Sequence, residues 1–237
     1  MTTFCDYPAE ATQIAKIGDF SNPSVEKIVA LEPQLVLATS GIQENLRGKL
    51  EKLGMQVFVC DPTTMDELYT DLEEMGALMG VSDQAGTLVE DMKSQVAAIE
   101  SKVASLDTPK VFLEIYGEPL MTAGTATLVD DLIVRAGGTN VGASAGEGFP
   151  EFNSEVLVEE DPDVYIAVKG AQSEPGEIAE RPGYDQIGAV ENGRVFVIDD
   201  NLVVRPGPRL VEGLAEMAHM IHPEAFADAA PEGSPSP

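Results

Sequence analysis

The sequence predicts an α/β fold of two lobes, each a parallel sheet flanked by helices, joined by one long rigid α-helix. Three observations support this. Short apolar runs alternate with helical segments, as in sheets whose parallel strands are buried between helices. A long amphipathic stretch without proline separates the first half of this pattern from the second. Both halves also contain one matching helix–proline–strand unit.

The stretch Ser82–Leu106 is expected to form a helix about 35 Å long, at ~1.5 Å per residue. Its apolar residues recur every three or four positions, on one stripe. Those residues are Leu88, Met92, Val96, Ile99, Val103 and Leu106. Ser82 or Asp83 should cap the start of this helix, and the segment 107–109 should end it. A surface helix of one large domain would show the same stripe, so the flanking parts must decide between the two interpretations.

The flanking parts predict lobes at residues 1–81 and 107–223, with 82–106 connecting them. In the first lobe we expect a strand ending near Pro8, then helices over 24–31, 44–53 and 65–79 and strands over 35–38 and 56–60. In the second we expect strands over 111–115, 164–168 and 195–198 and helices over 128–136, 153–160 and 208–220. Residues 224–237, ending in PEGSPSP, predict a disordered tail.

The matching unit places one glutamate at the same position in each lobe. Glu26 precedes Pro33 by seven residues and Glu155 precedes Pro162 by seven, and a strand follows each proline. A carboxylate in the first turn of a helix is favoured by the helix dipole, by roughly 0.3–1 kcal/mol, and this alone would explain either residue. Two such residues at related positions favour paired lobes, with two charged side chains able to meet basic residues of a partner.

Composition excludes several classes of protein. The 237 residues carry a net charge of −27, from 41 acidic and 14 basic residues, which repels nucleic acid and anionic lipid. No apolar run is long enough for a membrane span, so we expect no direct membrane insertion. Cys5 and Cys60 are too few for a disulfide framework and are expected to be free thiols. His219 and His222 lack neighbours at zinc-binding spacing.

Motifs for catalysis are also missing, so we expect no enzyme. The glycine-rich loop at residues 137–148 lacks the lysine and serine of a phosphate-binding loop, and it follows a helix where a dinucleotide loop should follow a strand. Ser144 has no histidine placed to form a triad. Carboxylates are abundant, but none stands out as an acid–base pair. A metal-dependent enzyme with the same two lobes, and an interaction module recruited through its acidic surface, are the alternatives.

Candidate ligand-binding residues lie where two joined lobes would leave a cleft, in loops after the carboxyl ends of parallel strands. The apolar candidates are Phe4, Phe20, Tyr116, Met121 and Phe149. Aromatic residues make up only 5% of the chain, so their concentration in such loops is informative, although each could instead fill a local core. Arg205 lies in a loop of a protein poor in basic residues; it either grips an anionic group of a ligand or pairs with a neighbouring acid.

Six motifs run through nearly the whole chain in a fixed order: TTFCDYP, GDFSNPSVEKIVALEPQLVLA, LEKLGMQVFVCDP, EIYGEPLMTAG, RAGGTNV and NLVVRPGPRLVEGL. In that order they resemble the cobalamin- and iron-chelate-binding proteins of ABC importers, whose two lobes are joined by a single rigid helix. The resemblance implies a binding protein without a cofactor that carries a metal chelate to the transmembrane subunits of a permease. A corrinoid is the favoured chelate, with haem and ferric siderophores as alternatives.

The resemblance also assigns roles to residues. In that family one glutamate per lobe docks onto arginines of the permease, and the matching motifs place these on Glu26 and Glu155. Aromatic cleft residues of the vitamin B12-binding members fall on Phe4, Phe20 and Phe149. Cobalamin binders tend to use tryptophan in the cleft, and this chain has none, which leaves all three chelates open.

The start of the chain departs from the family. Its members begin with another strand and helix after a signal or lipoprotein leader, so we expect the first lobe to lack that strand and helix. The resemblance implies an extracytoplasmic protein, in the periplasm or on the cell surface as a lipoprotein, whose leader is absent from this sequence.

Overall fold

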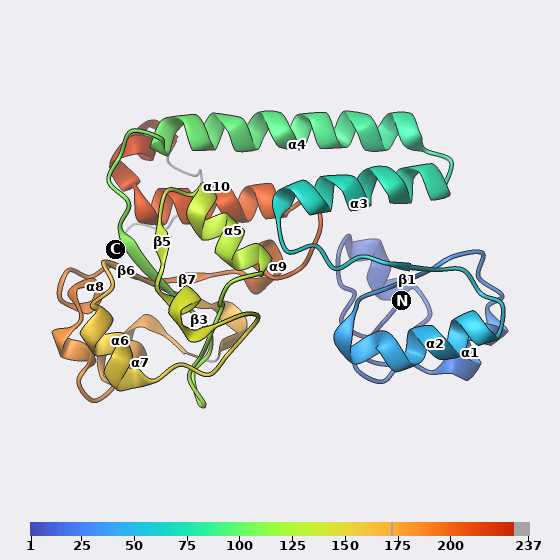
Figure 1. Cartoon of the computed structure of the whole chain (residues 1–237), viewed down its shortest axis with the longest axis horizontal. Helices are drawn as coiled ribbons and strands as arrows, with labels where there is room; N and C mark the ends of the chain where they lie inside the picture. Colours follow the sequence, from blue (N-terminus) through green and yellow to red (C-terminus); the bar gives the residue numbers. More distant parts are fainter. Residues whose placement is uncertain (172, 230–237) are drawn as a thin grey trace. The chain divides into compact units, whose positions relative to one another are not determined.

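A computed structural model describes residues 1–171 and 173–229 of the chain (Figure 1). The chain divides into two compact units, Met1–Asp61 and a second unit that begins at Pro62. Each combines helices with parallel strand pairing, which confirms the predicted α/β class.

The first unit is built on two short parallel strands. These are β1 (Val36–Ala38) and β2 (Val57–Val59), with Val36 opposite Val57. Around them lie η1 (Ala9–Gln13), α1 (Val25–Ala30), η2 (Gly41–Gln43) and α2 (Glu44–Lys52). The prediction of a strand that ends near Pro8 is wrong, because residues 1–8 adopt turns and irregular backbone. The Thr3 N–H donates to the Gly18 carbonyl at 2.9 Å, which holds this segment without a ladder.

The second unit contains a five-stranded sheet in the order β4-β3-β6-β7, with β5 also paired to β3. Its strands are β3 (Lys110–Tyr116), β4 (Met121–Thr122), β5 (Thr139–Asn140), β6 (Val164–Val168) and β7 (Val195–Ile198). β5 and β6 pair with β3 in parallel, and β7 with β6, as expected. β4 is antiparallel to β3. The prediction of a purely parallel sheet is therefore wrong at β4, because the short turn after Tyr116 is too short for the crossover that parallel pairing requires.

Helices cover both faces of this sheet (Figure 1). Side chains alternate along a strand, so Val111 and Leu113 face one core while Phe112 faces the other. The first core is closed by α3 (Met65–Leu78), α4 (Ser82–Val103), α5 (Leu128–Arg135), α9 (Asp200–Val203) and α10 (Leu210–Ile221). The second is closed by α6 (Ser154–Glu160), α7 (Pro175–Ala179), η5 (Tyr184–Gln186) and α8 (Gly188–Glu191).

Helix α4 is unbroken, and it packs against α3 and α10. Its buried stripe is Ala85, Val89, Met92, Val96, Ile99 and Val103. Leu88, which the predicted apolar stripe included, is exposed, because the buried stripe turns towards Ala85 and Val89. Val81 occupies the N-cap position and provides no side-chain bond, so the predicted cap by Ser82 or Asp83 is wrong. That α4 connects two lobes stays a prediction.

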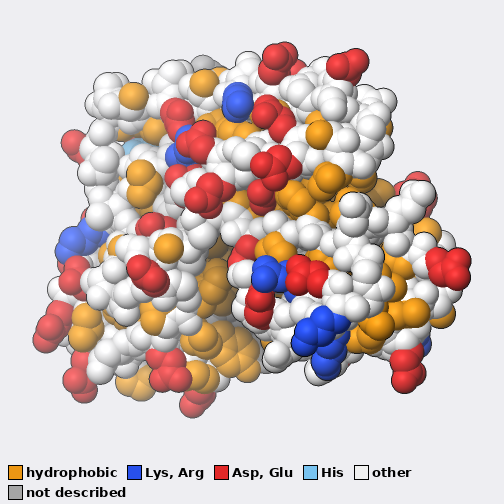
Figure 2. Space-filling model, turned by 45° about the vertical axis from the view of Figure 1, so that its right-hand side comes forward, with side chains coloured by type: hydrophobic (Ala, Val, Ile, Leu, Met, Phe, Trp, Pro, Cys, Tyr) orange, Lys and Arg blue, Asp and Glu red, His pale blue; other side chains and the backbone are white. Residues whose placement is uncertain are grey.

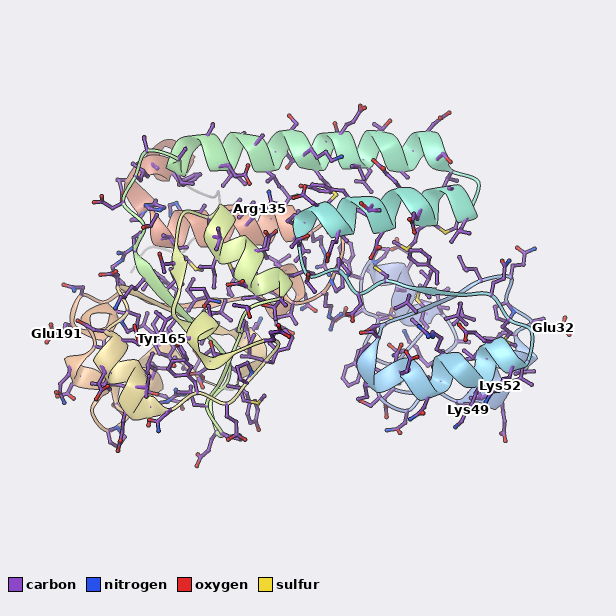
Figure 3. The ribbon with its side chains drawn as sticks, viewed as in Figure 1. Glu32, Lys49, Lys52, Arg135, Tyr165 and Glu191 are labelled. Atoms are coloured by element: carbon purple, nitrogen blue, oxygen red, sulfur yellow. The ribbon has the colours of Figure 1, made fainter. Side chains whose placement is uncertain are left out.

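Helix α3 shares its core with α4, because Met65, Leu68 and Tyr69 are buried in the same cluster as Val89. The predicted lobe boundary at residues 81 and 82 therefore falls inside the second unit. Arg135 reinforces this packing (Figure 3). Its guanidinium lies 2.7 Å from a carboxylate oxygen on each of three helices, from Asp66 of α3, Glu100 of α4 and Asp131 of its own α5.

The end of the chain differs from the predicted tail. Pro223–Ala229 forms the 3-10 helix η6, and Phe226 is buried in the core beside α10. The Lys102 ammonium lies 4.8 Å from the centre of the Phe226 ring. Burial of the Phe226 side chain in this core thus holds in place residues whose composition alone predicts disorder. The rest of the predicted tail, 230–237, lies outside the described residues.

Candidate ligand-binding site

Three predicted ligand-binding residues meet at the carboxyl end of β3. Tyr116 is the last residue of β3 and pairs with Met121, the first residue of β4. Met121 also forms a bridge with Glu151, which brings the loop that carries Phe149 beside β4. We call Tyr116, Met121 and Phe149 the β3 edge surface. Tyr116 and Met121 were predicted to lie in loops, whereas they are strand ends.

Backbone bonds between two loops hold Phe149 in place. The Gly124 N–H donates to the Gly148 carbonyl at 2.8 Å, and the Gly148 N–H donates to the Thr125 carbonyl at 2.9 Å. The Thr125 N–H donates to the Gly146 carbonyl at 2.8 Å. A Cβ on Gly124 would lie only 2.0 Å from the Gly146 carbonyl oxygen, so this approach requires glycine. The glycine-rich stretch thus serves to pack two loops together.

Phe4 and Phe20 lie on the first unit, on neighbouring segments. The bond from the Thr3 N–H to the Gly18 carbonyl places the backbone before Phe4 beside that before Phe20. The Gln43 side-chain amide donates to the Phe20 carbonyl at 2.8 Å. Tyr7, in the TTFCDYP motif, is as exposed as Phe4 but was not among the predicted ligand-binding residues. Its place directly before a proline, in a motif that carries the family resemblance, could have pointed to it.

The aromatic candidates are exposed, so the alternative that each fills a local core is wrong. Exposed fractions are 60% for Phe4, 42% for Phe20, 38% for Tyr116 and 44% for Phe149, and Met121 is half-buried. In a chain with only 5% aromatic residues, these exposed rings are available for contact with a ligand, and their ligand-binding role stays a prediction.

Arg205 follows α9, after the end of β7. Arg205 is half-buried. The strand that precedes it in the chain, β7, is separated from β3 by β6, so Arg205 does not follow a strand that pairs with β3. Asp199 lies at the same end of β7, where the backbone N–H of Asn201, with Lys169 and Arg209, holds the pKa of its carboxyl below the usual value. The role predicted for Arg205 stays a prediction.

A buried charged network lies next to the β3 edge surface, and no sequence motif predicted it. Glu114 of β3 has no exposed surface. Its carboxylate accepts hydrogen bonds from the Tyr165 hydroxyl, from Ser173 at 2.5 Å and from Arg181 at 2.6 and 3.1 Å. Figure 3 marks Tyr165 within the second unit. Arg181 also donates to the Ser173 hydroxyl at 2.7 Å.

The network shifts the protonation equilibria of its members. Burial, with the negative charge of Glu114, raises the pKa of Tyr165 well above its usual range. Burial acts to lower the pKa of Arg181, but the hydrogen bonds to Glu114, together with the charges and the hydroxyl of its other neighbours, outweigh it and raise that pKa. Burial also raises the pKa of Tyr184, whose ring lies 5.6 Å from the Arg181 guanidinium carbon. The arginine and the phenols therefore keep their protons at neutral pH.

Glu26 and Glu155 occupy equivalent positions in two equivalent helices. Each is the second residue of its helix, after the N-caps Ser24 and Asn153, whose side chains accept backbone N–H bonds. Both glutamates are exposed. Each helix is followed by a residue with positive φ directly before the proline, Glu32 at 46° and Asp161 at 49°. The repeated unit is thus confirmed at the level of the backbone, while the docking role of its glutamates stays a prediction.

Other features of the described residues bear on function. Neither Cys5 nor Cys60 is part of a disulfide bond. Within 1–171 and 173–229, no group of three or more His, Cys, Asp or Glu side chains is placed to hold a metal ion. No helix in that part of the chain has the length and hydropathy to cross a membrane. On the face shown in Figure 2, acidic side chains are far more frequent than basic ones.

Comparison with known proteins identifies the family of this chain. The sequence profile described as periplasmic binding protein matches residues 1–202. The chain belongs to the periplasmic binding protein family. This confirms the resemblance at the level of the family, and the two compact α/β units are the corresponding feature of the structure.

Individual relatives agree with this assignment. An uncharacterized ABC transporter substrate-binding lipoprotein, YvrC of Bacillus subtilis, is 31% identical over 96% of this chain and 74% of its own length. A vitamin B12-binding protein of Vibrio parahaemolyticus is 22% identical over 90% of this chain and 77% of its own. The periplasmic heme-binding protein RhuT of Roseiflexus has the same fold, with a TM-score of 0.83 at 23% identity over 94% of this chain and 89% of its own.

Proposed function

We propose that this protein is the substrate-binding component of an ABC importer, which captures a metal chelate and delivers it to a permease. The favoured chelate is a corrinoid such as cobalamin, and haem and ferric siderophores are the alternatives. The protein acts by binding alone and needs no cofactor. It works outside the cytoplasmic membrane, in the periplasm or as a surface lipoprotein.

The exposed aromatic side chains are the observation on which the proposal rests. A large flat ligand would cover the exposed parts of Tyr116 and Phe149 on the β3 edge surface. An aromatic side chain buries roughly 150–250 Å² in full, so covering about two fifths of each ring is worth about 2 kcal/mol per ring at ~25 cal/mol/Å². Phe4 and Phe20 offer similar surface on the first unit.

The names of relatives support the choice of ligand. They include vitamin B12-binding and heme-binding proteins, whose ligands are both large, flat metal chelates. The B. subtilis relative, named as an ABC transporter substrate-binding lipoprotein, supports delivery to a permease and the extracytoplasmic location.

Thermal melting with cobalamin, cobinamide, haemin and ferric siderophores tests the ligand. A ligand at a hundred times its Kd should raise the free energy of unfolding by about 2.7 kcal/mol. Replacing both Tyr116 and Phe149 by alanine should weaken the stabilising effect, whereas Val134→Ala, which shortens an exposed apolar side chain on α5, should not. A panel in which no chelate shifts the melting temperature would contradict the proposal.

Charge reversal tests the docking role proposed for Glu26 and Glu155. The variant Glu26→Lys/Glu155→Lys should weaken association with the permease while ligand affinity is kept, because both side chains are exposed helix-start residues. Glu73→Lys/Glu74→Lys makes the same change of charge at two exposed positions of α3 and should leave association unchanged. Loss of ligand binding in the first variant would instead place these glutamates in the ligand site.

A further inference from the structure

A hollow of about 260 Å³ opens in the second unit beside the β3 edge surface. Its lining includes Tyr116, Gly117, Glu118, Ser173, Glu177 and Arg181. Tyr116 belongs to both the hollow and the β3 edge surface. A group that extends from a ligand resting on the Tyr116 ring would therefore enter the hollow.

The inner end of the hollow is polar and fixed. Arg181 and Ser173 are held there by Glu114, through bonds between 2.5 and 3.1 Å. Gly117 keeps this end open, because a Cβ there would lie 2.6 Å from the Ser173 hydroxyl and 2.9 Å from the Arg181 guanidinium. Any side chain at position 117 would thus cover the polar groups that the hollow exposes.

The charges around the hollow favour an uncharged guest. Among the described residues of its lining, Arg181 is the one cation, and its charge is already matched by that of the buried Glu114. Glu118 and Glu177 are exposed lining residues and leave an excess of negative charge. A carboxylate entering the hollow would be repelled by both, whereas an amide can donate its N–H groups to them.

We propose that this hollow is a selectivity subsite that receives an amide arm of the bound chelate and disfavours a carboxylate arm. The inference rests on the proposed function and deepens it, because it distinguishes chelates with amide side chains from those, like haem, with carboxylate side chains. The β3 edge surface supplies contact area for any flat ring, and the hollow selects by the charge of the periphery.

A matched pair of ligands tests the subsite: cobalamin, and cobalamin in which single peripheral amides have been hydrolysed to carboxylates. Calorimetry gives the Kd of each for the wild type and for Glu118→Gln/Glu177→Gln. The monocarboxylate whose carboxylate replaces the arm in the hollow is the most weakly bound of the set, and the wild type should bind it roughly tenfold more weakly than cobalamin, because two like charges then lie a short distance apart in partly aqueous surroundings. The double variant should bind the two within about twofold. Glu73→Gln/Glu74→Gln on α3 removes the same charge elsewhere and should keep the wild-type ratio.

Each outcome of this experiment either supports or overturns the proposed subsite. Equal binding of both ligands by the wild type would overturn the subsite and leave the proposed function standing. So would a preference that persists in Glu118→Gln/Glu177→Gln, because another part of the protein would then select against the carboxylate. A wild type that binds neither corrinoid would overturn the subsite together with the corrinoid assignment. Both substituted side chains are exposed, and an unchanged melting temperature of the unliganded variant confirms that it folds.

Discussion

Replacing Arg181 by methionine removes the cation that neutralises Glu114, a carboxylate with no exposed surface. The carboxylate then loses its bonds at 2.6 and 3.1 Å and keeps those from Tyr165 and Ser173. A hydrogen bond to a charged group contributes roughly 1.5–3 kcal/mol, so the two losses cost about 3–6 kcal/mol. Part of this is offset because Arg181, whose side chain is only 23% exposed, no longer has to leave water. We expect Arg181→Met to lower the free energy of unfolding by about 3 kcal/mol.

The double variant Glu114→Gln/Arg181→Met separates loss of charge balance from loss of packing. A neutral amide needs no cation, so the double variant should recover about 1–2 kcal/mol relative to Arg181→Met. Urea denaturation followed by far-ultraviolet circular dichroism measures both, since the chain has no tryptophan. Lys110→Met, which removes a surface cation 3.3 Å from Glu160, should cost less than about 1 kcal/mol. Equal midpoints for the single and double variants would refute the reasoning, because Glu114 would then not depend on Arg181.

Three further predictions follow from other contacts. Arg135→Met should cost about 2 kcal/mol in a urea melt, because three carboxylates at 2.7 Å lose their partner, whereas Asp66→Asn changes only the most exposed of them and should cost under about 1 kcal/mol. Gly124→Ala should cost about 1–3 kcal/mol by forcing two loops apart; a melting temperature equal to that of the wild type would contradict this. Burial raises the pKa values of Tyr165 and Tyr184 above the pKa of a tyrosine in the unfolded chain, which is ~10. The stability that these two neutral phenols contribute to the folded protein is therefore complete below pH ~10 and is lost as the pH rises further. An absorbance titration in which all tyrosines of the folded protein ionise together near that value would exclude the shifts.

The local pattern of the sequence predicts most of the elements but not how they face each other. Strand β6, 164–168, was predicted residue for residue, because a buried apolar run after a proline needs no distant information. The stripe of α4 was misplaced at Leu88, since its orientation depends on α3. A Cβ on Gly76 of α3 would lie 2.3 Å from the Cβ of Ala85 of α4. The two helices therefore approach closely at these small residues, and Ala85 faces α3.

The positions of Tyr116, Met121 and Phe149 near strand ends were predictable from the sequence, although their ligand-binding role stays a prediction, and the charged network was not predictable. Exposed aromatic residues stand out in a chain with few of them, and loops at strand ends are where ligands bind in α/β folds. Glu114 lies inside the apolar run KVFLEIY, which does not indicate a cationic partner. Its partners Tyr165 and Arg181 lie 51 and 67 residues further along the chain, and only the folded sheet brings them together.

The loop pair beneath Phe149 is joined through main-chain atoms and glycines, so its shape owes little to the side chain that it displays. Evolution can therefore exchange residue 149 for another ring, or for a small residue, while the scaffold underneath stays as it is. On the proposed function, single substitutions at the tip of this one loop would change the surface offered to a ligand without disturbing the fold that carries it.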